Sequence, residues 1–158
     1  MSESIIDLDL DMISQKSNSI ELQLQSEKLE NERLIAATIF KSKNAILISD
    51  ANNLILRVNE SFTTITGYKI EDVIGKNPSI LASGREHQSF YRAMWESINN
   101  TGTWEGDIRN RRKDGLIYLE RLFISTVKDN SGVVLNYVAI FYRVDARNGI
   151  STTLRNFE

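Results

Sequence analysis

Residues 101–145 contain three strand-like runs, and the first of them alternates between two kinds of position with a period of two. The first run of this block carries charged residues at every second position, while its other face carries Trp104, Gly106, Ile108 and Asn110. Such a period predicts a strand with one face on a core. Turn signals at 113–115 (KDG) and 129–132 (DNSG) separate this run from two further runs rich in β-branched and aromatic residues. The block therefore predicts a three-stranded antiparallel meander.

Two shorter apolar runs, 45–49 (AILIS) and 54–58 (LILRV), flank a turn signal and predict a second hairpin. Asn59 is placed to cap a short helix over 60–66, which Gly67 would end. A further helical turn is predicted over 69–74, and Asn77-Pro78 opens a stretch predicted to be irregular as far as Gly84.

The longest helix of this region is predicted over 87–99. Its apolar residues recur every four positions at Phe90, Met94 and Ile98, with Tyr91 and Trp95 beside them. This spacing predicts a broad apolar face directed at the strands.

The N-terminal part of the chain differs in character. Residues 18–40 contain neither glycine nor proline and predict a helix of several turns. Leu22, Leu29 and Ala36 are spaced by sevens, as are Ile13, Ile20 and Leu34 in a row that Glu27 interrupts. This spacing indicates either a cap on its own domain or a short dimerising helix. Residues 1–17 are polar and acidic, and we expect them to be flexible.

Composition narrows the classes of protein. The 158 residues are 41% hydrophobic and 25% charged, with a net charge of −2, as expected for one globular domain with an extension. Charge therefore indicates no nucleic-acid or membrane partner. The absence of cysteine excludes thiolate chemistry, and with no apolar signal segment we expect a cytoplasmic protein.

The order of these elements and the sequences that connect them resemble those of the PAS domain family, of the type found in bacterial sensor kinases and cyclic-di-GMP signalling proteins. The resemblance covers about residues 40–145 and rests on Val58-Asn59 with Phe62, and on the segments 65–68 (ITGY), 72–76 (DVIGK) and 104–115 (WEGDIRNRRKDG). It implies an α+β fold: a five-stranded antiparallel sheet with short helices on one face and a pocket between. The expected division is a flexible 1–17, a helix over 18–40, the domain over 41–145 and a tail over 146–158.

The resemblance implies a signal-sensing and protein-interaction domain that binds a small ligand, dimerises and performs no catalysis. Relatives often end their last strand with Asp-Ile-Thr, where this chain has Arg143-Val144-Asp145. The tail is too short for a catalytic domain, so we expect a downstream signalling protein or effector domain that is not part of this sequence.

The pocket candidates are Trp104, Asn110, Phe62, Trp95 and Ile108. In flavin-binding relatives the matching Trp and Asn are associated with FAD, so an FAD-dependent redox sensor is the alternative function. The same sequence pattern also occurs in relatives without a known cofactor. Trp104 could equally fill the core, and Asn110 could bond to local backbone. The cofactor therefore stays open.

The sequence gives less support to a flavin–cysteine adduct, haem binding, nucleic-acid binding or catalysis. A flavin–cysteine adduct is excluded, and haem would depend on the sole histidine, His87, which fits a solvated helix start better. Arg109, Arg111, Arg112 and Lys113 form a basic cluster, which we interpret as a solvated hairpin that binds no nucleic acid. The carboxylates considered, Glu60, Glu71, Asp72, Glu96, Glu105 and Asp107, have no neighbouring nucleophile. A small-molecule-processing enzyme is thus the remoter alternative.

Overall fold

The computed structural model describes residues 3–144, which divide into a unit that ends at Phe40 and a second unit that begins at Lys41. The first unit is one helix, α1 (Glu3–Phe40). Every side chain from Asp9 to Ile39 is exposed. The helix is therefore longer than the predicted 18–40 and begins within the segment 1–17 that we expected to be flexible. With no glycine or proline before Phe40, nothing in the sequence stops the helix from extending toward the N-terminus.

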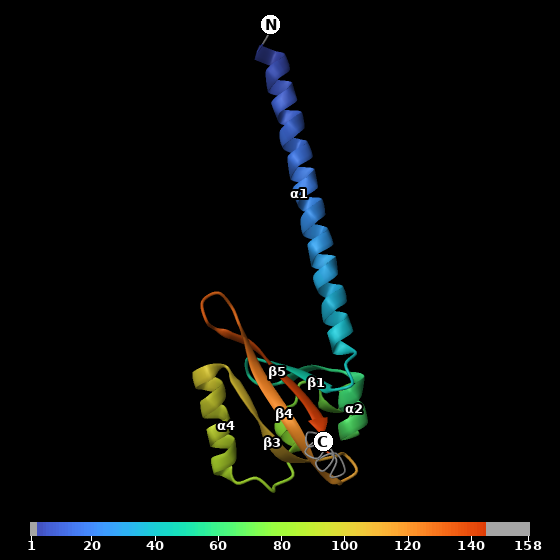
Figure 1. Ribbon diagram of the computed structural model, residues 1–158, viewed down its shortest axis with the longest axis vertical. Coiled ribbons are helices and arrows are strands. Elements are labelled where there is room, and N and C mark those ends of the chain that lie inside the picture. Colours follow the sequence, from blue (N-terminus) through green and yellow to red (C-terminus); the bar gives the residue numbers. More distant parts are fainter. Residues whose placement is uncertain (1–2, 145–158) are drawn as a thin grey trace, which may run out of the picture. The chain divides into compact units, whose positions relative to one another are not determined.

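The second unit is built on one antiparallel sheet with the order β2-β1-β5-β4-β3 (Figure 1). Its strands are β1 (Ala45–Asp50), β2 (Ile55–Val58), β3 (Thr103–Arg111), β4 (Ile117–Lys128) and β5 (Val134–Arg143). β1 pairs with both β2 and β5, and so joins the N-terminal hairpin to the meander. The predicted α+β fold with five antiparallel strands is confirmed.

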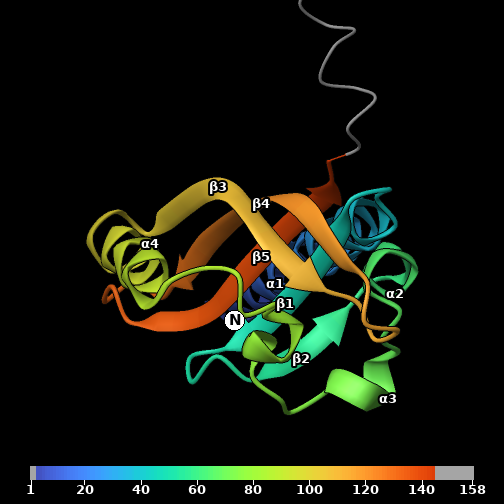
Figure 2. The same ribbon diagram turned by 90° about the horizontal axis from the view of Figure 1, so that it is seen from below.

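The helical segments between β2 and β3 are α2 (Glu60–Thr66), α3 (Ile70–Val73), the 3-10 turn η1 (Pro78–Leu81) and α4 (Gln88–Thr101). α2 and α4 lie at opposite ends of the sheet (Figure 2). The predicted caps of α2 are confirmed, because Asn59 accepts from the Phe62 N–H and Gly67 adopts a φ of 76°. The stretch after Asn77 is more ordered than predicted: the Asn77 side chain accepts from the Ser79 N–H, and proline fits the first turn.

A single buried asparagine fixes α2 against the sheet. Asn59 Oδ1 accepts the Ile46 N–H at 2.9 Å as well as the Phe62 N–H, and its Nδ2 donates to the Asn44 carbonyl at 2.9 Å. Phe62 is thereby held in the core, where its ring meets Phe141 of β5 edge-on with a centroid separation of 6.0 Å. Buried polar atoms satisfied in this way position a helix without a desolvation penalty.

Candidate functional site

A cavity of about 140 Å³ lies between the inner face of the sheet and the segment from η1 to α4. On the sheet side its lining is mainly apolar, with Leu47, Ile108, Leu122, Ile124, Ala139 and Phe141 beside the polar Ser49, Asn110 and Tyr137. Helical segments and their connections add Pro78, Leu81, Tyr91, Met94 and Trp95. A mainly apolar site with few polar groups is typical of small-molecule pockets, although those for drug-sized ligands span about 300–1,000 Å³.

Most polar residues of the cavity already have partners within the protein. Ser49 Oγ donates to Asn53 Oδ1 at 3.0 Å, and Asn77 caps η1. The Tyr91 hydroxyl is buried and has no hydrogen-bond partner, and burial raises its pKa. The α4 wall therefore contains a hydroxyl whose hydrogen-bonding capacity is unused.

Asn110 of β3 is the second polar residue with capacity for a ligand. It is 6% exposed, it lines the cavity, and its Nδ2 donates to Glu120 Oε1 of β4 at 2.8 Å. The side-chain Nδ2 therefore bonds to another side chain and not to local backbone, which was the alternative. Because Nδ2 is engaged, Oδ1 is the acceptor that remains on this side chain.

Glu120 is the residue that sequence reasoning missed. It is only 1% exposed, and burial raises the pKa of its carboxyl from 4.5 to about 7, while the nearby Tyr118 and Asn110 side chains act in the opposite direction. Its Oε2 and the Tyr118 hydroxyl nevertheless lack a partner that meets hydrogen-bond geometry. The inward direction of Glu120 follows from the register of β3 and β4. Asn110 pairs with Tyr118, so alternate residues of β4 from Tyr118 onward, Glu120 among them, share the inner face.

The predicted pocket residues fall into two groups. Trp95, Ile108 and Asn110 line the cavity together. Phe62 and Trp104 lie outside its lining, as members of the surrounding apolar core. The indole of Trp104 covers Gly106 so closely that an added Cβ would lie 2.5 Å from Cζ2, and it meets Phe90 edge-on at 5.6 Å. The Trp-x-Gly pattern therefore serves packing at this edge.

His87 caps α4, with its Nδ1 accepting the Ser89 N–H at 3.2 Å, and it does not line the cavity. Among the residues that the structure describes, no group of three or more His, Cys, Asp or Glu side chains could hold a metal ion. Within the same residues, no helix is long and apolar enough to cross a membrane.

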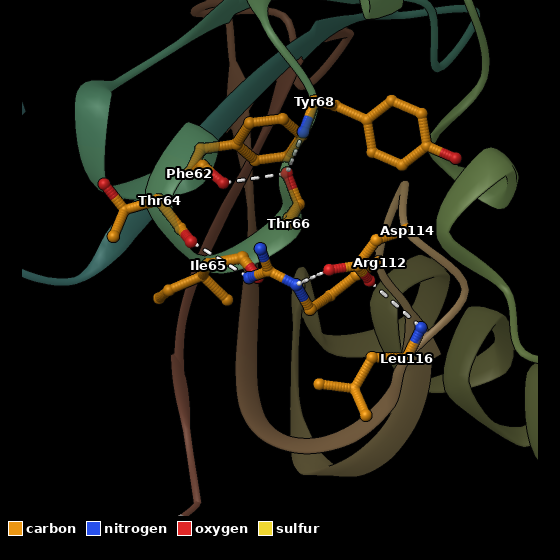
Figure 3. Close-up of polar contacts among 8 residues, drawn as sticks. All are labelled: Phe62, Thr64, Ile65, Thr66, Tyr68, Arg112, Asp114 and Leu116. Carbon is orange, nitrogen blue, oxygen red and sulfur yellow. Dashed lines mark hydrogen bonds and ion pairs between the residues drawn. The ribbon is translucent and has the colours of Figure 1, made fainter.

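The basic cluster ties the β3–β4 hairpin to its neighbours. Arg112 Nη1 donates to the carbonyls of Thr64, at 3.0 Å, and Ile65 near the end of α2, while its Nε pairs with Asp114 at 3.3 Å (Figure 3). Lys113 Nζ contacts Asp72 Oδ2 at 2.8 Å. Arg111 donates to the Ser83 carbonyl at 3.0 Å, and Arg109 contacts Glu86 at 3.3 Å. All four cations thus have protein partners.

We expect no DNA or RNA binding by this cluster at physiological salt, because phosphate contacts would compete with these internal ones. A mobility-shift assay with duplex DNA and single-stranded RNA checks this. A shift that the double variant Arg111→Ala with Arg112→Ala abolishes, and that Arg57→Ala leaves unchanged, would contradict it.

Comparisons with known proteins agree on one family. The PAS domain model matches residues 43–142. A nitrogen fixation regulatory protein of Klebsiella oxytoca is 30% identical over 112 residues, which cover 71% of this chain and 23% of that protein. The chain thus spans about a quarter of the length of this curated relative.

Solved structures resemble the domain as well. The PAS domain of a protein from Colwellia psychrerythraea has a TM-score of 0.66 at 22% identity, over 73% of this chain and 97% of that one. A light-oxygen-voltage domain, from a study of a flavin analogue, has a TM-score of 0.58 at 28% identity, over 66% of this chain and 80% of that one. The fold is that of a sensory module of signal-transduction proteins, and the chain belongs to the PAS domain family.

Proposed function

We propose that this chain is a sensory domain that binds a small, mainly apolar ligand in its cavity and performs no catalysis itself. The observation that carries the proposal is the cavity of about 140 Å³, lined mainly by apolar side chains, to whose lining Tyr91 and Asn110 add side chains with unused hydrogen-bonding capacity. A cavity of about 150 Å³ lined by apolar residues holds benzene in another protein. The ligand proposed here is accordingly a molecule of about one ring.

An FAD-dependent redox sensor is the second candidate, favoured by the likeness to the light-oxygen-voltage domain structure. The three-ring isoalloxazine is larger than the one-ring molecule that a cavity of about this volume holds in another protein, so we expect its binding to require the lining side chains to move. Asn110 and Trp95 could still provide a polar edge and an aromatic wall. We therefore propose the one-ring ligand first and flavin second.

We expect natively purified protein to lack flavin absorption bands and to take up no added FAD. A yellow preparation with a flavin spectrum, whose colour Asn110→Ala removes without unfolding the domain, would instead favour the redox sensor. Absorption spectra of the two proteins, recorded beside circular dichroism as a check on folding, decide between the candidates.

Toluene is a suitable probe for the cavity itself because it is apolar and has one ring. We expect it to shift the NMR signal of the Trp95 indole N–H, which lines the cavity, and to leave that of Trp104 unchanged. The variant Ala139→Leu adds bulk at the cavity wall and should abolish the shift. If millimolar toluene leaves Trp95 unchanged in the wild-type protein, the ligand-binding function is wrong.

We further propose that the chain forms a homodimer through α1. Its residues Leu10, Ile13, Ile20, Leu24 and Leu34 follow alternating three- and four-residue steps that Ser17, Glu27 and Asn31 complete. This is the spacing of a coiled-coil seam with polar interruptions. Ile20 and Leu24 are 52% and 62% exposed, so a second copy would cover apolar surface that this chain alone leaves in water.

The double variant Ile20→Asp with Leu24→Asp should dissociate the dimer, because it places four charges in one seam. Leu22→Asp with Leu29→Asp is the matched control, since these leucines, although themselves spaced by seven, are similarly exposed and lie off this seam. Light scattering at micromolar concentration measures the mass of each. A wild-type monomer, or dissociation by the control alone, would contradict the proposal.

A further inference from the structure

The buried carboxyl of Glu120 has more hydrogen-bonding capacity than the protein uses. Its Oε1 accepts from Asn110, whereas Oε2 is buried without a partner in a residue that is 1% exposed. A buried carboxylate with an unsatisfied oxygen destabilises the folded state. Such a group in a sensory domain needs an explanation beyond packing, and its one partner lines the ligand cavity.

The protonation state of Glu120 determines how the Asn110 amide can be oriented. An ionised carboxyl only accepts hydrogen bonds, so Asn110 must direct its NH₂ group at Glu120, as observed, and Oδ1 is left as an acceptor. A protonated carboxyl can donate its O–H to Oδ1. The amide can then turn over, which leaves its NH₂ group as a donor for the cavity.

We propose that Glu120 is a positioning residue whose protonation selects the ligand class: ionised Glu120 favours one-ring molecules with an N–H or O–H donor, and protonated Glu120 favours those with an acceptor. This inference rests on the proposed ligand-binding function of the same cavity. The 2.8 Å contact between Asn110 and Glu120 and the place of Asn110 in the cavity wall carry it.

The surroundings of Glu120 allow both states near neutral pH. In the pairing with β3, Glu120 lies opposite the apolar Ile108. In the pairing with β5, it lies opposite the exposed Arg143. Tyr118 is the titratable neighbour on β4, and the charges of Arg112 and Arg143 act on that hydroxyl. Burial is the largest influence on Glu120 and brings its pKa to about 7.

Aniline and toluene form a matched pair of probes, because they have the same shape and aniline replaces the methyl group with an N–H donor. We expect aniline, relative to toluene, to bind about 5-fold more tightly at pH about 8.5 than at pH about 5.5, as one hydrogen bond is gained. Benzaldehyde, which only accepts, should change in the opposite direction. Titrations of the Trp95 indole N–H signal give the three dissociation constants, with Trp104 as internal reference.

The variant Glu120→Gln keeps the shape of the side chain but cannot titrate, so its aniline-to-toluene ratio should not depend on pH. Asn110→Leu removes the amide that Glu120 orients and leaves Tyr91 in place, so its aniline-to-toluene ratio should also not depend on pH. Wild-type ratios that do not change with pH, or a change that persists in Glu120→Gln, would overturn the inference while ligand binding stands. Failure of all three probes to bind would overturn the proposed function as well.

Discussion

Replacing Glu120 by glutamine should stabilise the domain by about 3 kcal/mol at pH 8 and leave its stability nearly unchanged at pH 4. The carboxyl pKa rises from 4.5 to about 7 on folding because the group is buried. At about 1.4 kcal/mol for each pH unit, this difference gives the expected gain. Glutamine keeps the shape of the side chain and one oxygen that can accept from Asn110, but it carries no charge into the core.

The sign follows from proton binding. A folded-state pKa above the unfolded one means that the folded protein holds the proton more tightly, so the wild type is favoured at low pH. Its free energy of unfolding should therefore lose this contribution as pH rises from about 4.5 to about 7, and should stay at the lower level above that range. Glu120→Gln should lack this part of the pH dependence.

Urea denaturation of both proteins across this pH range measures the effect. Glu105→Gln is the matched control, because Glu105 lies exposed on β3 and its ion pair with Arg121 is expected to contribute less than about 1 kcal/mol. A difference between wild type and Glu120→Gln that is the same at pH 4 and pH 8 would contradict the elevated pKa.

The fold was predictable because its signals are local. The period of two from Trp104 to Asn110 places one face of β3 inward, and the turn sequence at Lys113-Asp114-Gly115 fixes the hairpin that follows. Asn59 and Gly67 similarly determine where α2 begins and ends. Each of these residues acts on its own neighbours in the chain, so single-sequence reasoning reaches them.

The polar end of the cavity was less accessible to such reasoning. β4 carries apolar residues on both faces, so its own pattern does not tell whether Glu120 or Leu119 points inward. Only the pairing of Asn110 with Tyr118 resolves this. Trp104 was assigned to the pocket because it shares a face of the strand with Asn110. Residues on one face can nevertheless lie far enough apart to contact different parts of the protein. Its indole instead lies over Gly106.

Arg112→Ala should destabilise the domain by about 2 kcal/mol, although Arg112 lies on a hairpin outside the core. Its guanidinium donates to the Thr64 and Ile65 carbonyls, which are among the last of α2 and have no partner further along the helix. Hydrogen bonds to a charged group contribute about 1.5–3 kcal/mol. The same helix carries the buried Phe62 and Thr66, so loosening its end also weakens core packing.

Lys113→Ala provides the comparison, because Lys113 is the next residue of the hairpin and its side chain is 51% exposed in its ion pair with Asp72. We expect that variant to cost less than about 1 kcal/mol, since solvent and salt screen such a pair. Arg112→Lys should fall between the two, because an ammonium lacks the planar fork that reaches both carbonyls and Asp114. Urea unfolding at low and high salt separates these cases: the Arg112→Ala effect should persist at high salt, and equal losses for Arg112→Ala and Lys113→Ala would show that the guanidinium contributes only its charge.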